Sequence, residues 1–111
     1  MDGMTDDAPD PVARYREIAE ELAPRGVTRS RMFGMPCLKD PAGKAFAGLR
    51  RDELVCRLGR DSQALAEALH LPGAHLFEPM GGRPMKDWVC LPSTTLGHWD
   101  NFAEAALGAE R

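Results

Sequence analysis

Apolar residues recur every three or four positions over residues 10–23, a periodicity that predicts an amphipathic helix. Asp10 is a suitable N-cap and Pro11 a suitable first helical residue. Pro24 and Gly26 mark the end of the helix. The apolar stripe consists of Val12, Tyr15, Ile18, Ala19 and Leu22. We expect this stripe to pack against the core of the protein.

Two further helices follow from the same periodicity. The second begins at Asp61 or Ser62 as its cap and ends at Pro72-Gly73. Its apolar side carries Leu65, Ala68 and Leu69. The third is capped by the run from Ser93 to Thr95. Its broad apolar face consists of Leu96, Trp99, Phe102, Ala103, Ala106 and Leu107.

Five segments have the composition of β-strands and are bounded by turn-forming residues. The first spans 27–33, and it either ends at Gly34 or resumes over Cys37-Leu38 after Pro36. The other four span 44–49, 53–58, 74–77 and 85–91. Gly81 and Gly82 lie between the last two strands, which is typical of a hairpin turn.

The predicted order is helix, three strands, helix, two strands and helix. Short connections favour antiparallel neighbours. The pattern therefore predicts an α+β fold with two layers, in which helices pack against a five-stranded, mostly antiparallel sheet. We expect residues 10–111 to form a single domain. Residues 1–9 are polar and acidic without periodicity, so we expect a disordered tail there.

Composition restricts the class of protein and its expected location. Hydrophobic residues make up 43% of the chain and charged residues 28%, values that are ordinary for a globular protein. No apolar run approaches the roughly 20 residues of a membrane-spanning helix, and the N-terminus lacks the apolar region of a secretory signal. We therefore expect a cytoplasmic protein. The cysteines, Cys37, Cys56 and Cys90, have no spacing typical of a disulfide framework.

Positive charge is concentrated in one part of the chain. The net charge of −3 divides into −5 over residues 1–24, +6 over residues 25–60 and −4 over residues 61–111. Segment 25–60 is either a solvated sheet face that faces the acidic helices, or a basic surface for an acidic partner or a nucleic acid.

Alternation along two strands gives this charge a possible site. Arg29, Arg31 and Phe33 share one face of the first strand, and Lys86 and Trp88 share one face of the last. If the faces coincide, they form a cationic, partly aromatic surface. Such a surface suits an acidic protein patch, a carboxylated ligand or single-stranded nucleic acid. The competing interpretation places both aromatic residues in the core, with arginine stems covering the sheet.

We expect no cofactor and no metal site, and the sequence favours a protein without catalytic activity while leaving an enzyme open as the alternative. The histidines His70, His75 and His98 and the three cysteines have none of the short spacings typical of zinc ligands. Cysteines on apolar strands behave as small hydrophobic residues. No nucleophile stands beside a recognisable base, and the glycines at 81–82 are not followed by a phosphate-binding motif.

Two motifs resemble a known family. The run from Arg31 to Gly34 follows an amphipathic helix, and the hairpin from Phe77 to Pro92 precedes a capped terminal helix. In this order the motifs resemble the N-terminal domain of the TfoX/Sxy family, over about residues 10–108. The resemblance implies an α+β domain with an antiparallel sheet. In the competence regulators of that family it implies assistance to a transcription factor, together with a second, C-terminal domain that these 111 residues do not include.

The expected function is therefore a non-enzymatic module for protein interaction or regulation. The alternative is a small-ligand-binding protein, or an enzyme without a recognisable motif, that uses a basic pocket on the sheet. We expect a protein partner with an acidic surface and neither membrane association nor direct nucleic-acid binding. The sequence indicates no particular oligomeric state.

Overall fold

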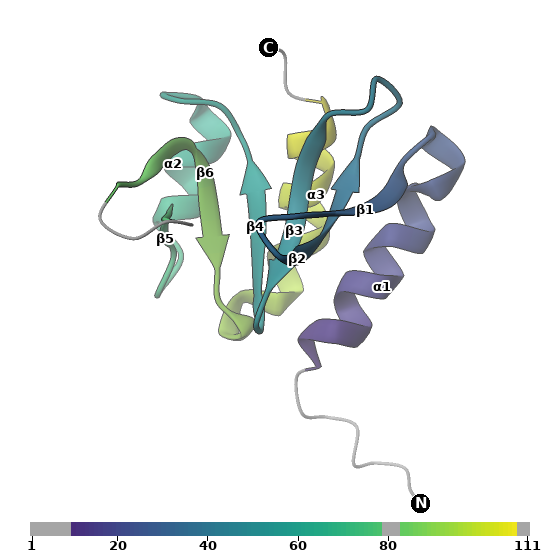
Figure 1. Cartoon of the computed structure of the whole chain (residues 1–111). Helices are drawn as coiled ribbons and strands as arrows, with labels where there is room; N and C mark the ends of the chain where they lie inside the picture. The colour runs from purple at the N-terminus through teal and green to yellow at the C-terminus, as the bar shows by residue number, and fades with distance from the viewer. Residues whose placement is uncertain (1–9, 79–82, 109–111) are drawn as a thin grey trace, which may run out of the picture.

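The structure, a computed structural model, describes residues 10–78 and 83–108 (Figure 1). Its elements, in chain order, are α1 (Pro11–Leu22), η2 (Ala23–Arg25), β1 (Thr28–Met32), β2 (Met35–Lys39), β3 (Ala45–Arg50), β4 (Glu53–Arg57), α2 (Gln63–Leu69), β5 (His75–Phe77), β6 (Met85–Leu91), η3 (Ser93–His98) and α3 (Trp99–Gly108). The α+β class is as predicted. None of the helices in the described ranges has the length and apolar character needed to cross a membrane. The expected tail and the Gly81-Gly82 turn lie outside the described residues.

The strands form one antiparallel sheet in the order β1-β2-β3-β4-β6-β5. The prediction of five strands is wrong, because the described residues form six. Phe33 and Gly34 have φ angles of 49° and 75°, and Met32 pairs with Met35 on either side of them. Two positive φ values in a two-residue loop are typical of a type I′ hairpin turn. The predicted first strand and its continuation are therefore separate strands, β1 and β2.

Side-chain caps begin two of the helices as predicted. The Asp10 carboxylate accepts a hydrogen bond from the Ala13 amide at 3.2 Å. Ser62, rather than Asp61, caps α2, and its hydroxyl accepts from the Leu65 amide at 3.0 Å. The run from Ser93 to Thr95 does not cap the last helix, because it forms the 3₁₀ turn η3 that precedes α3.

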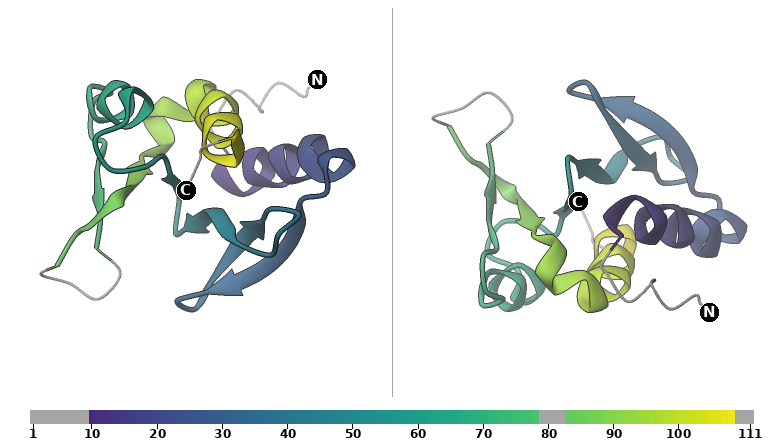
Figure 2. Two further views of the ribbon diagram at one scale, coloured as in Figure 1. Left: turned by 90° about the horizontal axis from the view of Figure 1, so that it is seen from above. Right: turned by 90° about the horizontal axis from the view of Figure 1, so that it is seen from below.

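The helices cover one face of the sheet. In the views of Figure 2 the helices lie on one side, and the β1–β2 and β5–β6 hairpins diverge on the other. α3 packs on β3 and β4, and α2 packs on β6. The largest fully buried side chain is Trp99 of α3. This layer forms the main hydrophobic core, as the amphipathic stripes predict for all but two positions. Val12 and Leu69 lie at the margins of their stripes and are 45% and 38% exposed.

The opposite face of the sheet, called here the open face, has a smaller core of its own. Its buried members are Met35, Val55, Phe77, Trp88 and Cys90. Gly48 lies in the same row, paired with Cys37 on one side and Val55 on the other. A Cβ atom at Gly48 would lie 2.7 Å from the Met35 Cε and 2.9 Å from the Pro36 carbonyl oxygen. Because Gly48 has no side chain, Met35 and the backbone of β2 can pack closely against it.

Candidate functional site

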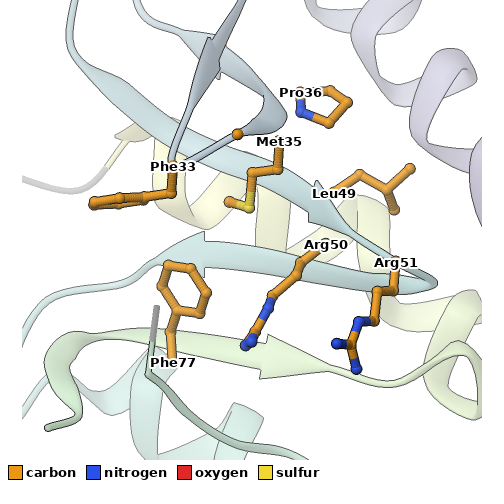
Figure 3. A pocket seen from close by; sticks show the side chains of 8 residues that line it. Phe33, Met35, Pro36, Leu49, Arg50, Arg51 and Phe77 are labelled. Atoms are coloured by element: carbon orange, nitrogen blue, oxygen red, sulfur yellow. The ribbon is translucent and has the colours of Figure 1, made fainter. Parts of the chain in front are cut away.

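A pocket of about 250 Å³ lies on the open face, where three segments meet (Figure 3). The segments are the β1–β2 turn, the β3–β4 turn and the end of β5. The lining residues are Phe33, Gly34, Met35, Pro36, Leu49, Arg50, Arg51 and Phe77. Two aromatic rings and two guanidinium groups thus surround one small opening.

Phe33 forms the aromatic wall of this pocket. Phe33 is a large hydrophobic residue, yet it is 57% exposed. Its ring meets the buried ring of Phe77 edge to face, with 6.0 Å between centroids. Phe77 in turn lies 6.2 Å from the ring of Trp88. The exposed ring is therefore the outer end of an aromatic row that is anchored in the open-face core.

Arginines cover the same aromatic row. The Arg50 guanidinium carbon lies 5.6 Å from the centroid of Phe77, and that of Arg57 lies 6.0 Å from the centroid of Trp88. In Figure 3 the Arg50 side chain lies between Arg51 and the ring of Phe77. Contacts between a cation and an aromatic ring hold the guanidinium in place while its charge remains available. The pocket is thus cationic on one side and aromatic on the other.

Both turns at the pocket hold a non-glycine residue in a left-handed conformation. Among the described residues, Phe33, Arg51 and Asp61 are the non-glycine residues with positive φ, at 49°, 59° and 63°. Two of these three line the pocket. The left-handed region costs an ordinary residue roughly 1–2 kcal/mol relative to its preferred backbone. Backbone strain of this kind concentrates at sites where a particular side chain must be presented.

The residues predicted from the sequence do not form one surface. Phe33 lies at the pocket, and Trp88 is buried in the core behind it. The expectation that Phe33 shares a strand face with the two arginines of β1 does not hold, because Phe33 is in a turn. Arg29 pairs with Leu38, whose side chain belongs to the helix-side core. By alternation Arg29 and Arg31 lie on that side of β1, away from the open face.

Arg31 and Lys86 have other surroundings. The Arg31 Nη2 donates a hydrogen bond to the Gly34 carbonyl at 2.9 Å and so supports the turn that holds Phe33. Lys86 lies beside α2, in a second hollow of about 350 Å³ with Arg60 and Asp61. The competing interpretation is therefore correct for Trp88, which is core, and not for Phe33, which is exposed.

Sequence reasoning missed Arg50, Arg51 and Phe77 as site residues. Phe77 ends a predicted short strand, and the two arginines lie between predicted strands. The pair of adjacent arginines between two apolar strands is the one local signal, and it is not specific on its own. That signal becomes specific only when the pairing of β2 with β3 brings the two turns together.

A second group of side chains lies on the open face next to this pocket. Glu53, His75 and Cys90 each present one ligand-type atom, and these atoms all lie within 4.8 Å of one another. The His75 Nε2 is 3.5 Å from a carboxylate oxygen of Glu53. Arg50, which lines the pocket, lies near enough to Cys90 for its positive charge to favour the thiolate. Within residues 10–78 and 83–108, these are the side chains that could hold a metal ion.

The cysteines are poor nucleophiles where the structure places them. Cys37, Cys56 and Cys90 are buried and free. Burial raises the pKa of the Cys90 thiol to about 12, and it also raises the pKa of the Cys56 thiol. A thiol held in its protonated form is unreactive toward electrophiles. The eight residues that line the pocket include no acid, histidine, serine or cysteine that could act as a base or nucleophile.

Comparison of the chain with protein-family models, curated proteins and solved structures gave no match.

Proposed function

We propose that this protein is a non-enzymatic interaction module that binds an acidic segment of a protein partner at the open-face pocket. Such a segment would place an apolar or aromatic side chain against Phe33 and a carboxylate against Arg50 or Arg51. Planar guanidinium groups bind carboxylates in two-pronged fashion, and aromatic anchors with arginines are the residues that carry most binding energy at interfaces.

The observation that carries this proposal is the strain at the two turns. Asn is favoured at the position of Phe33 in a type I′ turn, and glycine is favoured at many positions with positive φ. The protein instead places there a large exposed ring and, in the neighbouring turn, an arginine. Neither residue is explained by the stability of its own turn. Presentation of both side chains to a partner explains them together.

The size of the pocket favours a protein partner over the alternative of a small ligand. A volume of about 250 Å³ lies below the range of roughly 300–1,000 Å³ that is typical of sites for drug-sized molecules. It suffices for one or two side chains of a bound segment. The lack of a base or nucleophile in its lining also favours binding over catalysis.

The family resemblance supports the same class of function. We propose that the chain is a domain of the TfoX N-terminal type, in which a regulatory role through a protein partner is expected. The helix, the Arg31–Gly34 motif and the closing hairpin occur in the order that this resemblance requires. The three free thiols fit a reducing compartment, which supports the proposal of a cytoplasmic location.

Selection of displayed random peptides on the immobilised full chain tests the proposal. We expect the selected peptides to combine Asp or Glu with a large apolar residue. Fluorescence anisotropy then gives the affinity of one such peptide for the wild type, Phe33→Asn and Arg51→Glu. Loss of an interface anchor should weaken binding by about tenfold or more in each variant.

Arg16→Glu is the matched control, because it makes the same charge change at an exposed position of α1. We expect this variant to bind like the wild type. Peptides whose affinity is unchanged by Phe33→Asn and Arg51→Glu would contradict the proposal. Binding of benzoate or another small carboxylate at the pocket, with no peptide selected, would favour the small-ligand alternative.

A further inference from the structure

Three different ligand types meet on the open face, although the sequence has no ligand motif. Glu53, His75 and Cys90 come from β4, β5 and β6, three neighbouring strands of the sheet. We propose that these three side chains bind a zinc-class divalent metal ion through the Glu53 carboxylate, the His75 Nε2 and the Cys90 sulfur. This inference does not rest on the proposed function.

The strand register holds the three side chains together. His75 is paired directly with Cys90, and Cys90 is paired with Val55. Glu53 precedes Val55 by two residues and therefore points to the same face. The sequence could not show this arrangement, because zinc motifs are recognised by spacing within one segment and these ligands lie on three strands.

The distances require only a small closure. Zinc bonds of 2.0–2.3 Å in tetrahedral geometry place the ligand atoms about 3.3–3.8 Å apart. The His75 Nε2 already lies 3.5 Å from a Glu53 carboxylate oxygen, and no pair of ligand atoms is more than 4.8 Å apart, so the widest pair must contract by at most about 1.5 Å. Glu53 and His75 can make this movement because both side chains reach the surface, at 27% and 52% exposure. Cys90, the buried member, stays in place.

The histidine already has the tautomer that a metal needs. Its Nδ1 lies 3.0 Å from the Leu76 carbonyl oxygen. A carbonyl oxygen can only accept, so the hydrogen bond requires the proton on Nδ1. When the ring is neutral, Nε2 therefore carries the lone pair, and this atom faces Glu53 and Cys90. A backbone acceptor on the outer nitrogen is the usual support of a metal-binding histidine.

The donor set selects the metal. One nitrogen, one sulfur and one carboxylate oxygen suit zinc, and three protein ligands leave a fourth position for water. On binding, the S–H bond of Cys90 breaks, the sulfur bonds to the metal and the proton passes to the solvent. The thiolate and the carboxylate then balance the two charges of the ion. The nearby Arg50 guanidinium favours the thiolate form of Cys90.

The competing interpretation is a surface ion pair between His75 and Glu53 that covers a buried thiol. Such a pair contributes little to stability. The two interpretations differ in whether the Cys90 thiol and the His75 imidazole bind the same metal ion.

The experiment titrates the reduced, metal-free full chain, expressed without a histidine tag, with Zn²⁺ in competition with a chromophoric chelator. Co²⁺ serves as a spectroscopic probe, because sulfur ligation adds a charge-transfer band in the near ultraviolet. We expect one ion per chain. Glu53→Gln, His75→Gln and Cys90→Ser should each weaken Zn²⁺ binding by at least about tenfold.

His70→Gln and His98→Gln are matched controls at exposed histidines and should leave the affinity unchanged. His75→Gln keeps the test valid if Cys90→Ser does not fold, because position 75 is exposed on an edge strand. The inference is overturned if the wild type binds no Zn²⁺, if Co²⁺ gives no sulfur band, or if binding survives His75→Gln. The same peptide assay on metal-free protein separates this outcome from failure of the proposed function.

Discussion

Phe33 is the residue at which stability and binding require different side chains. It has a positive φ, it is largely exposed, and its ring ends an aromatic row that continues to Trp88. A turn residue selected for stability alone would be Asn or Gly. The conflict at this single position is what distinguishes the pocket from an ordinary surface hollow.

We therefore predict that Phe33→Asn stabilises the protein while it weakens partner binding. Asn adopts the left-handed conformation at lower cost and forms an Asn-Gly type I′ turn with Gly34. The lost ring contact with Phe77 offsets part of this gain. The free energy of unfolding should rise by up to about 1 kcal/mol, measured by urea denaturation.

Phe33→Ala provides the comparison, because alanine removes the ring without relieving the backbone. It should be less stable than Phe33→Asn. If Phe33→Asn were less stable than Phe33→Ala, the wild-type turn would not be strained at Phe33, and the prediction would be wrong.

At the scale of elements, α3 contributes the largest fully buried side chain of the described residues, Trp99. Trp99 is fully buried between the helix and the sheet, and its indole Nε1 donates a hydrogen bond to the Pro92 carbonyl at 3.3 Å. The bond ties the start of α3 to the chain that leaves β6. Thr95 donates to the same carbonyl oxygen at 2.7 Å.

Trp99→Ala should destabilise the protein by about 3–5 kcal/mol, because it removes the largest core side chain and leaves a cavity. Chemical denaturation followed by circular dichroism measures the change. Val12→Ala is a suitable control, since that apolar side chain on α1 is 45% exposed. A Trp99→Ala variant within about 1 kcal/mol of the wild type would show that α3 is not essential to the core.

The elements also show what could be predicted from the sequence. The caps at Asp10 and Ser62 and the periodic apolar stripes defined α1 and α2, because these signals are local. The sequence did not predict the turn between β1 and β2, because Phe33 occupies the position at which Asn before Gly34 would have indicated a hairpin. The local rule failed where the chain departs from it, and that departure coincides with the candidate site.

At the scale of the whole molecule, the site could not be predicted. The pocket requires the turns after β1 and β3 to meet the end of β5, and the ligand cluster requires the register of three strands. Alternation within one strand places side chains on a face, but it does not show which faces coincide. The positive charge of residues 25–60 is divided between the helix side and the open face of the sheet, because residues in one segment of sequence can point to either face.

The thiols give the whole molecule a pH dependence. Burial raises the folded-state pKa of Cys37, Cys56 and Cys90, whereas the unfolded thiols ionise near pH ~8.5. Their contribution to stability is therefore complete below this pH and is lost as the pH rises toward the folded-state pKa. For metal-free protein, the free energy of unfolding should fall above pH ~8.5, by up to about 1.4 kcal/mol per pH unit for each thiol.

Urea denaturation between neutral and alkaline pH measures this decline. Cys56→Ala removes one titrating group and should make the decline less steep. A free energy of unfolding that rises or stays constant as the unfolded thiols ionise would contradict the burial of these groups.

The place of β1 at the edge of the sheet has a consequence for self-association. An edge strand offers unpaired backbone groups to any other extended chain, and charged side chains along it oppose such pairing. β1 carries Arg29 and Arg31 at exposed, alternate positions. Two protomers that approached edge to edge through β1 would bring these guanidinium groups together. The arginines that the sequence suggested as binding residues thus act against aggregation.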